Sequence, residues 1–435
     1  MKDKIIIKGG KPLTGEVTIG GAKNAVLKIM AAALLVDGIC EINNVPELTD
    51  VHTMTEVLKH LGPNVEFSKG RMVIDSSTLS NFVAPYDFVS KMRASFIVLG
   101  PLLARCGQAK VALPGGCAIG ERRIDLHVKG LQALGAEVSI NHGYVEAKAS
   151  KLTGTEIHLD RPSVGATENL MLAATLAEGS TVLINAAQEP EIVDLANFIN
   201  SIGGDVTGAG TSEIFINGVR PSDLHSTSYT TIPDRIEAGT FMCAALATRG
   251  DIIINRVFPT HLGAIMSKMA SMGANIRILD PFTIKIGCPE RPKAVDIVTQ
   301  PYPGLPTDMQ APFTSLLAIS KGVSIVTESI YENRFRQLGE LRRMGANVQH
   351  EGNHAIIKGV SELTGTQVKV SDLRAGASLL IAGLTAKGQT EITDLHHIDR
   401  GYEHVVKKFQ GVGADISRVI TLDDGITFVP EQLRL

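Results

Sequence analysis

The chain has 435 residues, of which 44% are hydrophobic and 20% are charged, and its formal net charge is −3. This length exceeds what one ordinary hydrophobic core accommodates, so two large domains are expected. The near-neutral charge argues against nucleic acid or a membrane surface as the main partner. The composition therefore indicates a globular protein that acts on small molecules.

The cysteines and the apolar segments indicate a compartment. Five cysteines occur, an odd number, scattered and without C-x-x-C spacing, so neither a disulfide framework nor a zinc site is expected. The first eight residues are too poor in apolar side chains for a signal peptide. The longest apolar stretch, 29–36, is far below the roughly 20 residues that a membrane helix needs. We therefore expect a cytoplasmic protein with reduced thiols, no metal and no other cofactor.

The predicted elements begin with two short apolar segments, 5–8 and 17–19, which we interpret as an opening hairpin. From there the chain repeats itself six times. One marker is a glycine that follows an apolar, helix-like run and recurs every 66 to 72 residues, at Gly38, Gly107, Gly179, Gly250, Gly322 and Gly388. A second glycine trails the first by 23 to 28 residues, at Gly62, Gly135, Gly203, Gly273, Gly345 and Gly413. Two markers that stay in phase over six periods indicate a repeated structural unit.

Each glycine is expected to end a helix, because glycine accepts the left-handed conformation that closes a helix C-terminus. A strand pattern follows the first glycine, at 40–42, 110–113, 181–184, 251–254, 323–326 and 391–393. A pair of strands follows the second glycine, as at 138–140 and 145–147. The unit is therefore β-α-β-α-β-β once the preceding strand is included. A solenoid is the alternative, but its units are usually shorter, about 20–50 residues.

Six units divide into two domains of three units. The opening hairpin is expected to supply a missing edge to the last unit, and the chain is expected to cross between domains near 20–21 and 231–233. This places 1–21 plus 232–435 in one domain and 22–231 in the other.

One position in the repeat carries charge. The residues 14 or 15 positions before each first glycine, in the opening turn of a helix, are Lys23, Arg93, Gly165, Arg235, Asp308 and Arg374. Four of the six are cationic, although helix N-termini favour acidic residues. Cations there are favourable if an anion binds between them and the free amides, so a cleft for a polyanionic ligand is expected. Independent salt bridges are the alternative.

Further segments contain candidate reactive or anion-binding residues. Cys117 follows Leu113-Pro-Gly-Gly and precedes Arg122, so nearby cations and free amides should lower its thiol pKa and make it an acid, base or nucleophile. An unimportant thiol in a turn is the alternative. Arg334 and Arg400 lie among polar residues and suit bidentate pairing with phosphate or carboxylate. The segment 163–167 could open a helix over a diphosphate, or be an ordinary N-cap.

Together these residues resemble the UDP-N-acetylglucosamine 1-carboxyvinyltransferases, a family of enolpyruvyl transferases in the EPSP synthase-like group. The likeness covers essentially the whole chain, and nine motifs carry it: Gly20-Gly-Ala-Lys-Asn24, Met92-Arg-Ala-Ser95, Leu113-Pro-Gly-Gly-Cys117, Ser163-Val-Gly-Ala-Thr167, Pro233-Asp-Arg-Ile-Glu237, Pro306-Thr-Asp-Met-Gln-Ala311, Glu332-Asn-Arg-Phe335, Asp372-Leu-Arg-Ala375 and His397-Ile-Asp-Arg-Gly-Tyr402. The resemblance implies an α/β fold of two inside-out α/β-barrel domains, each of three β-α-β-α-β-β repeats.

The resemblance also implies a reaction. The enolpyruvyl group of phosphoenolpyruvate would pass to the 3′-hydroxyl of UDP-N-acetylglucosamine by addition and elimination, with release of phosphate. This is the first committed step of peptidoglycan synthesis, so the family supports cell-wall biogenesis, cell shape and division. The inhibitor fosfomycin would react at Cys117. The sequence carries no signal for an oligomeric state.

The resemblance assigns roles residue by residue. Asp308 would take the hydroxyl proton, Cys117 would act as the acid, and Lys23 would assist catalysis. Phosphoenolpyruvate would contact Lys23, Asn24, Arg93, Cys117, Arg122, Arg334 and Arg400. UDP-N-acetylglucosamine would contact Asn24, Arg93, Arg122, Arg161, Ser163, Val164, Gly165, Asp308 and Ile330. The segment 160–162 differs from many members around the diphosphate, but Arg161 keeps a positive charge there.

Three alternatives remain at this point. The shikimate-pathway enolpyruvyl transferase shares the fold, but its family lacks the Pro-Gly-Gly-Cys loop. The RNA 3′-phosphate cyclases have related repeats and need a histidine nucleophile, for which His127 and His397 are available. A catalytically silent paralogue that binds the sugar nucleotide is the third.

Overall fold

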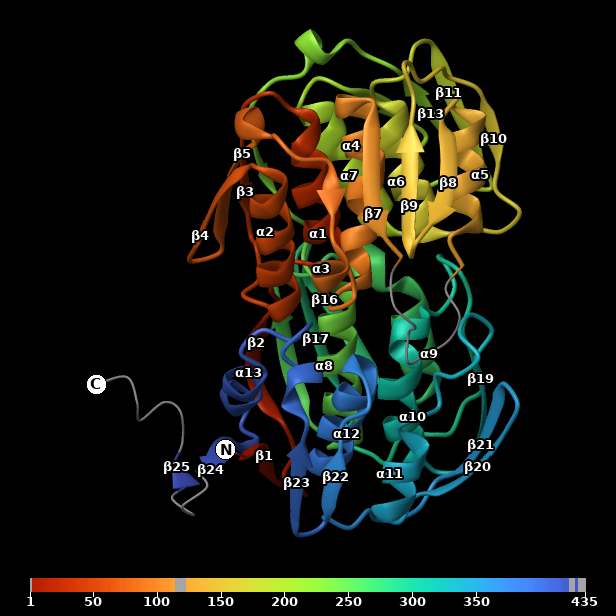
Figure 1. The fold of residues 1–435 in the computed structure, drawn as a ribbon. Coiled ribbons are helices and arrows are strands. Elements are labelled where there is room, and N and C mark those ends of the chain that lie inside the picture. Colours follow the sequence, from red (N-terminus) through yellow and green to blue (C-terminus); the bar gives the residue numbers. More distant parts are fainter. Residues whose placement is uncertain (1, 114–122, 422–426, 429–435) are drawn as a thin grey trace. The chain divides into compact units, whose positions relative to one another are not determined.

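The computed structural model describes residues 2–113, 123–421 and 427–428 (Figure 1). The chain divides into two compact units. The first unit contains the described residues of 1–20 and 233–435, and the second unit contains those of 21–116 and 122–232. The described residues of each unit form three β-sheets, and every sheet has four strands except the last, which has five.

The six sheets follow one pattern of pairing. The first strand runs parallel to the second, the second pairs antiparallel with the fourth, and the fourth pairs antiparallel with the third. In four repeats a helix follows the first strand along the chain, whereas in the sheets of β14 (Thr227–Thr230) and β2 (Thr14–Thr18) the first strand comes from a distant segment. A second helix joins the second strand to the third in every repeat. This confirms the β-α-β-α-β-β unit expected from the glycine period.

The second unit holds three repeats. The first comprises β14 (Thr227–Thr230), α1 (Lys23–Ala32), β3 (Ile39–Asn43), α2 (Thr49–Leu61), β4 (Asn64–Ser68) and β5 (Arg71–Asp75). The next comprises β6 (Val83–Ala84), α3 (Tyr86–Val89), α4 (Leu99–Cys106), β7 (Gln108–Ala112), α5 (Asp125–Ala133), β8 (Glu137–Asn141) and β9 (Tyr144–Lys148). The third comprises β10 (Glu156–His158), α6 (Val164–Ala174), β11 (Ser180–Ile184), α7 (Pro190–Ser201), β12 (Asp205–Thr207) and β13 (Glu213–Asn217).

The first unit holds the other three repeats. They begin with β2 (Thr14–Thr18), α8 (Arg235–Ala247), β15 (Asp251–Asn255), α9 (Gly263–Ser271), β16 (Asn275–Asp280) and β17 (Thr283–Gly287). The next comprises β18 (Ile297–Val298), α10 (Gln310–Ala318), β19 (Val323–Thr327), α11 (Leu338–Arg343), β20 (Asn347–Glu351) and β21 (His354–Lys358). The last comprises β22 (Gln367–Lys369), α12 (Leu373–Thr385), β23 (Gln389–Thr393), α13 (Val405–Gly411), β24 (Asp415–Thr421), β25 (Thr427–Phe428) and β1 (Lys2–Lys8). Short 3₁₀ helices are η1 (Ala33–Leu35), η2 (Ser76–Thr78), η3 (Arg93–Val98), η4 (Pro221–Asp223), η5 (Pro259–Leu262), η6 (Thr307–Met309) and η7 (Leu395–His397).

Each unit places helices inside and sheets outside. Every residue of α8 and of α10 is buried, and these helices are rich in small side chains that permit close packing. The strands instead alternate between exposed and buried residues, as in β13 and β21, because one face of each sheet covers the helices and the other faces solvent. Helix α10 packs against α12, where Ser315 Oγ lies 2.6 Å from Ser378 Oγ. This is the expected inside-out arrangement.

The predicted opening hairpin is wrong, because its two strands join different sheets. β1 pairs antiparallel with both β23 and β24, so it takes the place of the fourth strand in the last repeat. Among the described residues this repeat has only the two-residue β25 after β24, and β1 supplies the strand between β23 and β24. β2 pairs parallel with β15 and serves as the first strand of another repeat. The N-terminal segment therefore does complete the last unit, but from an interior position rather than as an edge.

The left-handed conformation predicted for the marker glycines is confirmed at the second glycine of all six repeats, where φ lies between 84° and 114°. The prediction fails at two first markers, Gly38 and Gly250, which are outside the left-handed region. In the repeat of Gly250, the preceding residue Arg249 has the left-handed conformation, with φ of 55°. A β-carbon on Gly250 would overlap the backbone oxygen of Leu13, so this glycine is explained by the close approach of another chain segment.

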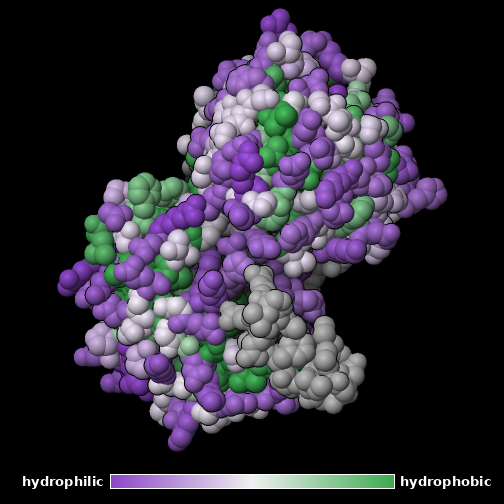
Figure 2. Space-filling model, turned by 90° about the vertical axis from the view of Figure 1, so that its left-hand side faces the viewer, coloured by the Kyte–Doolittle hydropathy of each residue, from purple (hydrophilic) through white to green (hydrophobic). Residues whose placement is uncertain are grey.

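The exposed face in Figure 2 is mainly polar, with apolar side chains in scattered groups. Within the described residues, no helix combines the length and the hydropathy that crossing a bilayer demands.

Candidate active site

The charged repeat position lies at helix starts, as predicted. Lys23, Arg93 and Arg235 are the first residues of α1, η3 and α8. Gly165, Asp308 and Arg374 are the second residues of α6, η6 and α12.

Asp308 lies between two buried arginines of the first unit. Arg334 Nη2 donates to Asp308 Oδ1 at 2.6 Å, and Arg374 Nη2 donates to Asp308 Oδ2 at 2.7 Å. The arginines are 5% and 3% exposed, whereas 23% of the Asp308 side chain is accessible. Burial alone would raise the pKa of Asp308, but the two guanidinium groups hold that pKa well below its usual range. The site therefore holds an ionised carboxylate with one accessible side.

Further hydrogen bonds fix both arginines. Arg374 Nη1 donates to Tyr402 Oη at 3.1 Å, and Tyr402 is buried with its hydroxyl 2.8 Å from Thr240 Oγ1. Arg334 Nη1 donates to Thr307 Oγ1 at 2.9 Å. Since Tyr402 follows Arg400 by two residues, the arginine loop that the sequence singled out is linked to the Asp308 cluster.

Glu328 is a residue of this cluster that the sequence analysis missed. It is 2% exposed and accepts hydrogen bonds from the Ile330 and Tyr331 amides and from the Thr299 and Thr307 hydroxyls. The sequence signal that could have identified it is an acidic residue directly after the strand β19, six positions after Gly322.

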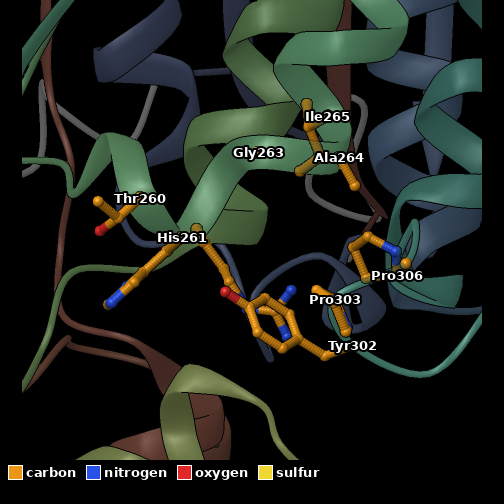
Figure 3. Close-up of a pocket in the computed structure, with 10 residues that line it drawn as sticks. Thr260, His261, Gly263, Ala264, Ile265, Tyr302, Pro303 and Pro306 are labelled. Carbon is orange, nitrogen blue, oxygen red and sulfur yellow. The ribbon is translucent and has the colours of Figure 1, made fainter. Parts of the chain in front are cut away.

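A small pocket opens in the first unit beside the segment 302–306, just before η6 (Figure 3). Its volume is about 120 Å³. Figure 3 shows residues from η5 and the start of α9 on one side and Tyr302, Pro303 and Pro306 on the other. The guanidinium carbon of Arg235 lies 5.6 Å from the centre of the Tyr302 ring. Pro306 lines the pocket and directly precedes η6, so the pocket adjoins the turn that carries Asp308.

In the second unit, Lys23 is paired with a carboxylate. Its Nζ lies 3.1 Å from Asp50 Oδ2, at the start of α2, and both side chains are largely buried. Both Lys23 and Arg374 therefore pair with a carboxylate in this structure, and the anion site expected at this repeat position stays a prediction. Asn24 is half-buried, and its backbone oxygen accepts from Lys28 Nζ at 3.3 Å.

The start of α6 contains the predicted diphosphate segment. Ser163 is the N-cap, and its Oγ accepts from the Ala166 amide at 3.4 Å. The amides of Val164 and Gly165 belong to the first helical turn, where no intrahelical acceptor exists for them. Arg161 lies just before this turn and donates to Asp125 Oδ1 at 2.8 Å.

His127 lies under the same turn. A β-carbon on Gly165 would touch its ring, and Asn169 Nδ2 donates to its Nδ1 at 3.0 Å. Burial, with a smaller contribution from the charge of Arg93, lowers the pKa of His127 to about 3. A buried imidazole whose Nδ1 already accepts a hydrogen bond is poorly placed to attack a nucleotide, which disfavours the RNA cyclase alternative at this residue.

The predicted site residues divide between the two units. Within the first unit the structure brings Asp308 and Arg334 together, with Ile330 four residues before the latter. Cys117 and Arg122 lie outside the described residues. Across 2–113, 123–421 and 427–428, no three His, Cys, Asp or Glu side chains are grouped so as to hold a metal ion.

Comparison with known proteins identifies the family. Residues 7–409 match the family EPSP synthase (3-phosphoshikimate 1-carboxyvinyltransferase). UDP-N-acetylglucosamine 1-carboxyvinyltransferase 2 of Carboxydothermus hydrogenoformans is 54% identical over 418 residues, which cover 96% of this chain and 99% of the relative. UDP-N-acetylglucosamine 1-carboxyvinyltransferase of Desulforapulum autotrophicum is 53% identical over 421 residues, covering 96% and 100%.

Solved structures support the fold. The enolpyruvyl transferase NikO from Streptomyces tendae superposes with a TM-score of 0.86 at 24% identity, covering 96% of this chain and 99% of that one. EPSP synthase from Acinetobacter baumannii gives 0.72 at 20% identity, covering 96% and 100%. With a match to the family over most of its length and relatives more than half identical from end to end, the chain belongs to the UDP-N-acetylglucosamine 1-carboxyvinyltransferases, within the EPSP synthase family.

Proposed function

We propose that this protein transfers the enolpyruvyl group of phosphoenolpyruvate to the 3′-hydroxyl of UDP-N-acetylglucosamine and releases phosphate. The observation that carries the proposal is the 50–54% identity, over 95–96% of this chain, with proteins of that name. By the same inference it performs the first committed step of peptidoglycan synthesis in the cytoplasm, and so serves cell-wall biogenesis, cell shape and division.

The substrates explain the number of cations. Phosphoenolpyruvate carries a phosphate and a carboxylate on one small molecule, and arginine pairs with both groups in bidentate fashion. We assign its binding to Lys23, Asn24, Arg93, Cys117, Arg122, Arg334 and Arg400. The sugar nucleotide would bind Asn24, Arg93, Arg122, Arg161, Ser163, Val164, Gly165, Asp308 and Ile330. The free amides at the start of α6 are suited to its diphosphate.

The reaction needs a base and an acid. The 3′-hydroxyl loses its proton and attacks the central carbon of phosphoenolpyruvate while a proton reaches the methylene carbon. The tetrahedral ketal then loses phosphate and one proton of the new methyl group, which restores the double bond. We assign the base to Asp308 and the acid to Cys117.

The structure adds a condition for the base. Two arginines keep Asp308 ionised, which leaves it able to accept a proton, but they also weaken it as a base. If the anionic groups of the substrate draw Arg334 away from Asp308, the carboxylate becomes more basic when both substrates are present. Base strength would then depend on occupancy of the site.

The test is release of phosphate. The purified protein is incubated with phosphoenolpyruvate and UDP-N-acetylglucosamine, and the expected result is one phosphate and one enolpyruvyl ether for each sugar nucleotide consumed. Release with shikimate 3-phosphate instead selects the shikimate-pathway reaction. Binding of the sugar nucleotide without release selects the silent paralogue.

A further inference from the structure

One position of the repeat marks the end of the second strand in each sheet. Six residues after the first glycine of each repeat stand Asn44, Leu113, Asn185, Arg256, Glu328 and Asp394. Four of them, at 44, 185, 256 and 394, have φ between 59° and 61°. This position therefore commonly serves as a left-handed turn that ends the strand.

In two repeats the side chain at this position ties together the ends of two parallel strands. Asn44 Nδ2 donates to the backbone oxygen of Thr231, directly after β14, at 2.8 Å. Asn185 Nδ2 donates to the backbone oxygen of Leu159, directly after β10, also at 2.8 Å. In both repeats the first and second strands are thus held together where they end.

The repeat that carries Asp308 uses this position differently. Glu328 Oε1 accepts from Thr299 Oγ1, directly after β18, at 2.8 Å, and from the amides of Ile330 and Tyr331 at 2.8 and 3.1 Å. Its Oε2 accepts from Thr307 Oγ1 at 2.9 Å. A single buried carboxylate therefore joins the end of β18, the turn of Asp308 and the loop of Ile330.

The bond to Thr307 gives the network a direction. An arginine can only donate, so the Thr307 hydroxyl accepts from Arg334 and must direct its own hydrogen to Glu328. The other arm of Arg334 donates to Asp308. The orientation of the Arg334–Asp308 pair thus depends on an acceptor at Glu328 Oε2.

We propose that Glu328 is a positioning residue for enolpyruvyl transfer, which orients Arg334 and Asp308 through the Thr307 hydroxyl. This inference rests on the proposed function. Glu328 has no contact with Asp308 among the bonds of the described residues, and it acts through Thr307.

The experiment measures kcat and both KM values for three variants. Glu328→Gln retains the three bonds to Oε1 but replaces Oε2 with a donor, so Thr307 loses its acceptor. Thr307→Val removes the hydroxyl at nearly constant volume, and Thr307→Ser retains it. Asp394→Asn is the control, since it makes the same charge change at the equivalent repeat position, where the side chain pairs with exposed Lys369.

We expect Glu328→Gln and Thr307→Val each to lower kcat by about 10- to 100-fold, the size expected for one bond in a charged network. The KM for UDP-N-acetylglucosamine should stay within about threefold, because the Ile330 loop keeps its bonds. Thr307→Ser and Asp394→Asn should stay within about threefold of the wild-type kcat. The double variant should be little worse than the worse single variant, because both changes break one relay.

Other results overturn the proposal. Thr307→Val with wild-type kcat refutes it, even if Glu328→Gln fails to fold. A change confined to the KM for the sugar nucleotide refutes it as well. Wild-type protein that releases no phosphate rejects the proposed function, whereas active wild type with equally active variants rejects only the role of Glu328.

Discussion

Replacing Asp308 with alanine should reduce both stability and rate, and the stability loss can be worked out from the structure. The change leaves the buried guanidinium groups of Arg334 and Arg374 without the carboxylate they share, and breaking a buried pair costs about 3–5 kcal/mol. Each arginine retains one hydroxyl acceptor, and the Asp308 side chain is 23% exposed, so the lower end, about 3 kcal/mol, is expected. In a unit of roughly 200 residues this lowers the melting temperature by about 6–12 °C.

The rate should fall further than the stability explains. Loss of a general base lowers kcat by about 10²- to 10⁴-fold. Asp308→Asn is the matched variant, since it retains the shape and one acceptor: it should lose less stability than Asp308→Ala but as much rate. Calorimetry and phosphate release at pH 7.5 measure the two effects. A kcat within tenfold of wild type refutes the base assignment, and a stability loss under about 1 kcal/mol refutes the buried-pair reasoning.

The acid dependence of stability checks the same cluster. The pKa of Asp308 is lower in the folded protein than its usual value of 3.8, so ionisation favours folding. This contribution is present above pH 3.8 and is lost as the pH falls through the folded pKa. The difference in unfolding free energy between wild type and Asp308→Ala should therefore shrink on acidification below pH 3.8. A difference that stays constant would show that the carboxylate charge is not what stabilises the cluster.

Three further predictions concern other parts of the chain. Fosfomycin should alkylate Cys117 and leave the exposed Cys106 unmodified, and phosphoenolpyruvate should slow the alkylation. Peptide mass spectrometry identifies the modified thiol, and an adduct on both cysteines would argue against selective activation of Cys117. Burial raises the pKa of Glu168 to about 7, so protonation of this carboxyl favours folding, and stability is lost as the pH rises from 4.5 to 7. Over this pH range the unfolding free energy of Glu168→Gln should rise by about 3 kcal/mol relative to that of wild type in urea titrations. Parallel pH curves for the two proteins would contradict the pKa shift. Gly359→Ala should destabilise by more than about 2 kcal/mol because its β-carbon would overlap a backbone oxygen, whereas Gly339→Ala in α11, with open space around it, should be neutral or slightly stabilising; equal effects would refute the packing argument.

Much of the fold could be predicted because its signals are local. Glycine at helix ends and alternation in strands depend on nearby residues, so the spacing of Gly62 and its five equivalents was enough to define the unit. The opening segment was rightly expected in the last unit, but the interior position of β1 and the separate sheet of β2 could not be predicted in this way. Both segments have strand character, but their partners, β24 and β15, lie hundreds of residues later, and alternation does not specify which strand pairs with which.

For the candidate site, the sequence likewise predicted the positions of the charged residues but not their pairing. Counting back from the glycines found Asp308 and Arg374 as equivalent positions, but not that they form an ion pair across 66 residues. The pairing of Lys23 with Asp50 was likewise not predicted. Charge and spacing indicate which side chains stand at helix starts. Pairing depends on how the buried helices pack, which the pattern of one repeat does not contain.

Glu328 shows how function can arise from a departure within a repeated scaffold. At the equivalent positions Asn44 and Asn185 each make one bond that holds two strand ends, which is a structural contribution. A carboxylate accepts more hydrogen bonds than an amide, and Glu328 accepts four without adopting the left-handed turn. The added acceptors reach the Asp308 turn, so in this repeat the position links the scaffold to the residues to which we assign catalysis. Repeat positions where one copy forms more hydrogen bonds than its equivalents are therefore the places in this fold where further site residues should be sought.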